Sequence, residues 1–280
     1  MFGCYTRIMT YNSLAPNVRL PYNIIKGTVA QRREKVINCV DKLYKDLYPK
    51  FVHGKVSVAD IQKSVDKVIG AKGKVHVIKN PPNMFDEGGQ DVLFSDFNGK
   101  LSAITLEMDT KEKFFKFPDL ITILHEFSHV ADMFFHPKYT ARYQYMASEG
   151  LYFKKYDKLY EDIFYHEEKP LGRRYKAKRL RRVEYKLLNF LKKVPKEDRM
   201  EYIQDIRYCL TSEAEAYKTQ LKYARILDRK HHPVKKGDLN DECDTFLFDE
   251  KLKIVNHVAS VLIQKEQLKM KKGPRVNRKH

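Results

Sequence analysis

Residues 124–132 read LHEFSHVAD and place two histidines four residues apart, with a glutamate directly after the first. Four residues of α-helix return side chains to one face, so His125 and His129 can direct two imidazole nitrogens at a zinc ion about 2.0–2.1 Å away. Glu126 lies about 100° further round the helix, where it can reach a water molecule beside the ion without binding the ion itself. The spacing therefore predicts two zinc ligands and a general base on one helix.

The helix that must hold these residues is predicted from about Pro118 to Phe135. Proline is favoured in a first helical turn, and His136-Pro137 ends the pattern. Apolar residues cover much of the helix surface, namely Leu120, Ile123, Leu124, Phe127, Val130, Ala131 and Phe134. A helix of this kind is buried, and buried polar side chains need partners. A metal ion would supply one; histidines in ordinary core hydrogen bonds are the plainer alternative.

Periodicity and turn residues predict the elements around this helix. Strands are expected where polar and apolar residues alternate, and two of them flank Asn98-Gly99, a dipeptide typical of hairpins. The predicted strands are 74–78, 92–97 and 101–108. The predicted helices are 32–48 closed by Pro49, 58–69 ended by Gly70, Ala141–Tyr165, about 200–229 with a joint near Thr211-Ser212, and 251–268.

The stretch HEFSHVAD, with the strand LSAITLEM upstream, resembles the active-site helix and edge strand of the zincin metallopeptidases over about residues 74–136. The metzincin subgroup would need Gly at position 132 and His at position 135, where this chain has Asp132 and Phe135. The gluzincin subgroup, in which a later helix supplies a glutamate as third ligand, is the better match. The resemblance implies an α+β, mostly helical fold with a small mixed sheet, and a substrate lying extended along residues 101–108.

Three glutamates are candidates for the third ligand. Glu213 in SEAEAYKTQ resembles the E-x-x-A arrangement of several small gluzincins, and it interrupts an apolar helical stripe. Glu215 fits a related pattern, but it could equally complete a capping box with Ser212. Glu149 follows His129 at a spacing similar to that of thermolysin-like enzymes. Glu213 is the preferred ligand, and the other two stay open.

Further residues could assist such a site. Asp132, one turn after His129, could accept a hydrogen bond from a ligand imidazole, or it could be an exposed helical aspartate. Tyr208 or Tyr217 could donate to a developing oxyanion. With three protein ligands, zinc keeps a position open for water, and Glu126 would remove a proton from that water during peptide hydrolysis.

Length and composition indicate the size of the core, the number of domains and the compartment of the protein. The chain has 280 residues, 42% of them hydrophobic, which is enough for a sizeable core, and we treat residues 1–280 as one domain. Residues 28–136 would form an α/β half and residues 141–268 a helical half. The four cysteines are scattered singly, no signal peptide is visible, and no transmembrane run is apparent, which favours a cytoplasmic protein without excluding delivery into another cell.

The net charge of +18 is concentrated in two segments. Residues 169–193 hold eleven Lys or Arg and a single acid, and residues 269–280 hold six Lys or Arg and none. These segments could bind nucleic acid or an acidic protein, or they could be solvated surfaces. The sequence therefore favours a zinc-dependent endopeptidase. The alternatives are a basic, nucleic-acid-associated protein with a vestigial or structural metal site, and a toxin or effector peptidase of narrow specificity.

Overall fold

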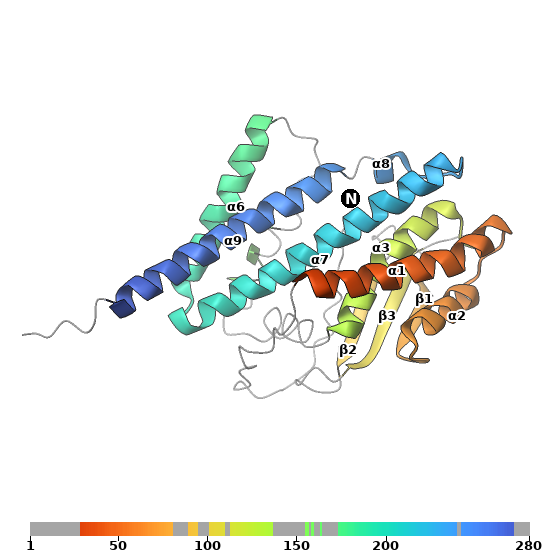
Figure 1. Cartoon of the computed structure of the whole chain (residues 1–280), viewed down its shortest axis with the longest axis horizontal. Coiled ribbons are helices and arrows are strands. Elements are labelled where there is room, and N and C mark those ends of the chain that lie inside the picture. The colour runs from red at the N-terminus through yellow and green to blue at the C-terminus, as the bar shows by residue number, and fades with distance from the viewer. Residues whose placement is uncertain are drawn as a thin grey trace, which may run out of the picture.

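The computed structural model describes residues 29–80, 89–94, 101–109, 113–136, 155–156, 158–159, 163, 173–239 and 242–271. This part of the chain is mostly helical, and the long helices α7 and α9 run side by side across the molecule (Figure 1). The helices are α1 (Val29–Val52), α2 (Val58–Ile69), α3 (Phe117–Phe135), α6 (Arg173–Lys193), α7 (Lys196–Arg229), α8 (Lys236–Leu239) and α9 (Glu242–Lys271). The strands are β1 (Val75–Asn80), β2 (Gly89–Phe94) and β3 (Leu101–Asp109).

The three strands form one mixed sheet in the order β1-β3-β2, with β1 parallel and β2 antiparallel to β3. The predicted antiparallel pair is present, although β2 covers residues 89–94 rather than 92–97, and the Asn98-Gly99 turn lies outside the described residues. The expectation that residues 101–108 form an edge strand is wrong. β3 pairs on both sides, so among the strands that the structure describes β1 and β2 lie at the two edges of the sheet.

The helix α1 runs past Pro49, where the sequence predicts its end. Proline removes one backbone donor from the helix. Leu47 and Phe51, on either side of it, are 0% and 4% exposed, and their burial in the core holds the last turn in place. The helix α2 ends as predicted at Gly70, whose φ of 72° is a left-handed conformation that glycine adopts without strain.

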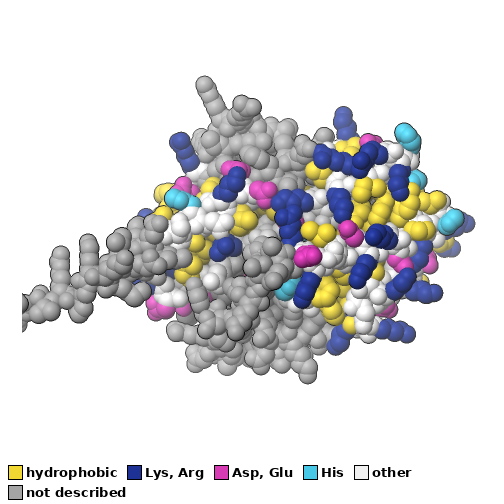
Figure 2. Space-filling view, viewed as in Figure 1, with side chains coloured by type: hydrophobic (Ala, Val, Ile, Leu, Met, Phe, Trp, Pro, Cys, Tyr) yellow, Lys and Arg dark blue, Asp and Glu magenta, His cyan; other side chains and the backbone are white. Residues whose placement is uncertain are grey.

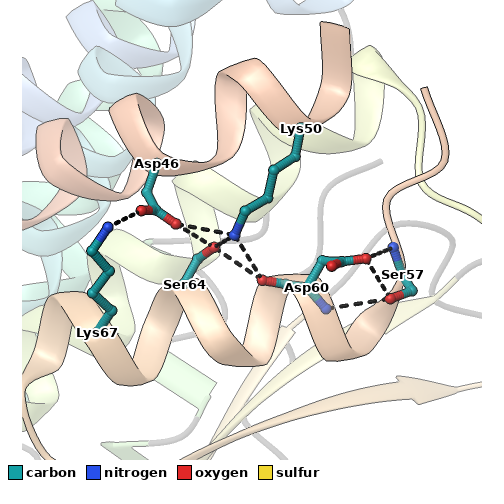
Figure 3. A network of polar contacts seen from close by, with 6 residues as sticks. All are labelled: Asp46, Lys50, Ser57, Asp60, Ser64 and Lys67. Atoms are coloured by element: carbon teal, nitrogen blue, oxygen red, sulfur yellow. Dashed lines mark hydrogen bonds and ion pairs between the residues drawn. The ribbon is translucent and has the colours of Figure 1, made fainter. Parts of the chain in front are cut away.

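A polar network joins α1 to α2 (Figure 3). Ser64 of α2 donates a hydrogen bond of 2.7 Å to Asp46 of α1, and Lys67 binds the other oxygen of the same carboxylate. The Lys67 hydrogen bond is the main reason that the pKa of Asp46 lies well below its ordinary value. At the start of α2, Ser57 and Asp60 form a capping box, which satisfies backbone donors of the first turn.

Two hydrophobic clusters make up the described core, and α7 contributes to both. One cluster contains residues of α1, α2, the sheet, α3 and the last turns of α7. The other contains residues of α6, α7 as far as Tyr217 and α9, together with Tyr156, Leu159 and Ile163. The joint predicted near Thr211-Ser212 is not present, because α7 is one unbroken helix. The Thr211 hydroxyl donates to the carbonyl of Arg207 within that helix, so the hydroxyl does not interrupt the backbone.

The remaining helices differ from the predictions mainly in their bounds. The basic segment at 169–193 contains the helix α6, and α9 begins nine residues before the predicted helix at 251–268. The short helix α8 is not predicted. The predicted helix at 141–165 falls largely outside the described residues. Within the part that the structure describes, no helix combines the length and apolar character that a membrane span needs.

Candidate metal centre

The three preferred ligands lie together where α3 packs against α7. One candidate ligand atom from each of His125, His129 and Glu213 lies within 4.8 Å of the other two. His129 Nε2 is 3.7 Å from Glu213 Oε2, and the two imidazole rings have centroids 5.2 Å apart. Because α3 supplies both histidines and α7 supplies the glutamate, the cluster joins two helices that are far apart in sequence.

Each histidine has one ring nitrogen that is buried without a hydrogen-bond partner among the described residues. These atoms are Nδ1 of His125 and Nε2 of His129. Burial lowers the pKa of both histidines to about 4, so each ring is neutral near pH 7 and carries a lone pair for a metal. Two imidazoles and a carboxylate form a donor set that zinc accepts. The residues therefore fit the ion that the sequence predicts.

Side chains of α7 hold the opposite side of both rings. His129 Nδ1 is 3.0 Å from the Ser212 hydroxyl, and Gln220 hydrogen-bonds the side chain of His125. Gln220 Nε2 also donates to Asp238 at 3.1 Å, which ties the orientation of the Gln220 amide to α8. Outer partners of this kind fix the tautomer and orientation of metal-binding histidines.

Sequence patterns alone do not identify these outer partners. They suggest a helix cap for Ser212 and give Gln220 no role. A continuous helix over 196–229 would have revealed both, because Ser212 directly precedes Glu213 and Gln220 follows it by two turns. Asp238 comes from the four-residue helix α8, for which the sequence carries no periodic signal.

Glu126 lies next to His125 and is not one of the three clustered residues. Its carboxylate Oε1 is 4.0 Å from His125 Nε2, and the residue is 5% exposed. This contact is to the ring nitrogen opposite the unpartnered Nδ1 of His125, so the distance does not by itself place Glu126 beside an ion that Nδ1 would hold. The role of Glu126 as general base stays a prediction.

Glu213 is almost buried, with 14% of its side chain exposed. Burial raises the pKa of its carboxyl, while the charges of His125 and Lys251 oppose that rise. Lys251 comes from α9, is 1% exposed, and places its ammonium 4.8 Å from the centre of the Phe248 ring. A nearby buried cation offsets part of the cost of burying a carboxylate. No sequence pattern marks Lys251 as part of this region.

Of the two predicted tyrosines, Tyr217 lies against the cluster. Its ring meets the His125 ring edge-on at 5.0 Å between centroids and stacks on Phe248 at 5.5 Å. Tyr208 is nine residues earlier on α7 and is also buried. A contribution of either tyrosine to catalysis stays a prediction.

Asp132 differs from both expectations for it. It is 4% exposed, so it is not a solvated helical aspartate. Its carboxylate bonds the His136 ring at 3.0 Å, and the Nδ1 atom of His129 is bonded to Ser212 instead. Ser212 therefore occupies the position that the sequence assigned to a carboxylate.

Among the described residues, no alternative third ligand lies in the cluster of His125, His129 and Glu213. Glu215 pairs with Arg33 of α1 at 2.6 Å and with Lys218 at 3.3 Å, and it is not among the three clustered residues. It forms no capping box with Ser212, since α7 does not begin there. Glu149 lies outside the described residues. Glu213 remains the preferred third ligand.

Searches of family models, curated proteins and solved structures found no match to this chain.

Proposed function

We propose that this chain is a zinc-dependent endopeptidase in which His125, His129 and Glu213 hold the metal. The observation that carries the proposal is the meeting of these three side chains, with two buried imidazole nitrogens that have no hydrogen-bond partner within the described part of the chain. The zincin resemblance of HEFSHVAD adds to it. When bound, zinc would polarise a carbonyl and lower the pKa of water from about 15.7 towards about 7.

The protein groups have separate tasks in this proposal. Glu126 accepts a proton from the attacking water and passes it to the leaving amine. Ser212 and Gln220 hold the two imidazoles in the tautomers that leave one lone pair on each ring. Burial of Glu126 and both histidines excludes bulk water from this set of groups.

A peptide substrate needs a strand edge with unpaired backbone groups. β3 cannot offer one, because both of its edges are paired. The edge strand β2 is the better candidate, since α3 packs against β3 and β2. We therefore expect the substrate to lie along the outer edge of β2, with its scissile bond directed towards α3.

The test begins with purified full-length protein, its zinc content and its cleavage of a peptide library with and without a chelator. Glu126→Gln should keep one zinc per chain and the wild-type circular dichroism spectrum while losing cleavage. Glu213→Gln should lose the metal, because the neutral amide replaces an anionic ligand.

The matched control is Glu215→Gln, two residues further along the same helix, which should keep the metal because its carboxylate pairs with Arg33 instead. Stoichiometric zinc in Glu213→Gln would eliminate Glu213 as a ligand. Full activity in Glu126→Gln would eliminate the proposed base.

The burial of the cluster also favours a second candidate, a structural metal site in a protein that is not a peptidase. His125 and His129 are 6% and 3% exposed, and structural zinc sites are closed to solvent whereas catalytic ones keep a position open. Bound zinc without chelator-sensitive cleavage, together with unfolding on metal removal, would support this candidate over the first.

A further inference from the structure

The strongest concentration of charge in the described chain lies on α6. This helix of 21 residues contains ten Lys or Arg and one acid. By contrast, the Lys and Arg side chains over α1 and α7 in Figure 2 are scattered among acidic and apolar ones. Neither the candidate metal centre nor the proposed hydrolysis uses α6.

The two sides of α6 differ sharply over residues 181–193. Val183, Leu187 and Phe190 are 3%, 0% and 5% exposed and belong to the second hydrophobic cluster. The exposed residues of the same stretch are Arg181, Arg182, Tyr185, Lys192 and Lys193. Four of these five are cations, and the fifth is aromatic.

Tyr185 is 67% exposed, more than any other exposed large hydrophobic residue in the described chain. Arg181 precedes it by four residues and Arg182 by three, so both lie next to it on the helix surface. An aromatic ring beside guanidinium groups offers a stacking surface and positive charge at the same place. Nucleic-acid bases and phosphates match these two features.

We propose that the exposed side of α6 binds single-stranded nucleic acid, with Tyr185 stacking on a base and Arg181 and Arg182 contacting phosphates. A duplex fits less well, because its bases are already stacked and give Tyr185 no partner. An anionic membrane also fits less well. Membrane-surface helices insert an apolar face, and the apolar face of α6 is occupied by the core of the protein.

The test uses the full-length protein and a fluorescent single strand longer than the roughly 16 nucleotides that one binding fold can cover. Anisotropy titrations at several salt concentrations should give a linear fall of log K with log salt. Tyr185→Ala should weaken binding about 5- to 150-fold. It should leave the salt slope unchanged, since no charge is removed. Tyr185→Phe should retain most of the affinity.

The paired substitution Arg181→Gln with Arg182→Gln should reduce the salt slope by about 1.4, or about 0.7 for each phosphate that is no longer neutralised. The matched control is Lys35→Gln with Lys42→Gln, which removes the same charge from exposed positions of α1 and should leave the slope unchanged. Circular dichroism checks that every variant is folded.

Four results would overturn the proposal: no salt-dependent binding, wild-type affinity in Tyr185→Ala, an equal fall in affinity in the α1 control, or tighter binding to a duplex or to anionic vesicles. Each result is independent of whether the chain hydrolyses peptides.

Discussion

Removing the Ser212 hydroxyl should weaken zinc binding without unfolding the protein. Ser212 lies 3.0 Å from His129 Nδ1, and the other nitrogen of that ring is 3.7 Å from Glu213. If Nε2 binds the metal, Nδ1 must carry the proton and donate it to the serine oxygen. In Ser212→Ala, that buried N–H has no acceptor, and the hydrogen bond that sets the direction of the ring is gone.

The magnitude follows from the kind of hydrogen bond that the substitution removes. A neutral hydrogen bond contributes about 0.5–1.5 kcal/mol net, and removal of an outer partner costs about 10- to 100-fold in metal affinity. Ser212 also lines a pocket with Ser128 and Thr219, from which a water molecule could replace the hydroxyl. We therefore expect a decrease in affinity near tenfold, equivalent to about 1.4 kcal/mol.

The assay is a competitive titration of the metal-free protein with zinc and a chromophoric chelator near pH 7. Ser212→Thr keeps the hydroxyl and should restore most of the affinity. The matched control is Thr211→Val, since the Thr211 hydroxyl donates to the Arg207 carbonyl inside α7. The reasoning is refuted if Ser212→Ala binds zinc as the wild type does, or if Thr211→Val weakens binding as much.

Two further predictions concern parts of the fold away from the metal centre. Asp46→Asn should lower the free energy of unfolding near pH 7 by about 1–3 kcal/mol, because Ser64 and Lys67 lose a charged acceptor. The folded-state pKa of Asp46 is depressed below its ordinary value of 3.8. The stabilisation that Asp46 contributes is therefore present above pH 3.8 and is lost as the pH falls below that value. On acidification, the free energy of unfolding in urea should fall less for Asp46→Asn than for the wild type. An equal fall in the two proteins would contradict this. Cys39 is 4% exposed, and burial raises the pKa of its thiol to about 11. Mass spectrometry should therefore find Cys39 unmodified by iodoacetamide near pH 8 until urea unfolds the chain. Rapid alkylation of the folded protein would show that α1 is not packed as described.

The sequence predicts the elements that follow from local patterns. The glycine that ends α2, the proline at the start of α3 and the apolar residues over much of the α3 surface are local signals, and the structure agrees with all three. Strand order is not local. Nothing in residues 101–108 indicates that β1 pairs on one side and β2 on the other. A strand that is predicted at the edge of the sheet can therefore lie at its centre.

The residues of the candidate site also fall into two groups, those that local spacing predicts and those that depend on how the helices pack. The spacing of His125 and His129 requires only that α3 be a helix, so sequence places these residues together. The convergence of Glu213 depends on the packing of α7 against α3, and sequence could only rank it against Glu149 and Glu215. Ser212 and Gln220 could be found only once α7 was known to be continuous.

The position of the cluster gives metal binding a structural consequence as well as a chemical one. α3 belongs to the first hydrophobic cluster, whereas Glu213 lies next to Ala214 and Tyr217, which belong to the second. An ion held by His125, His129 and Glu213 would therefore connect both parts of the core through α7. A ligand that binds only the folded state stabilises it by about 2.7 kcal/mol at 100 times its dissociation constant. In this arrangement that stabilisation acts on the packing of α3 against α7, because the three ligands come from those two helices.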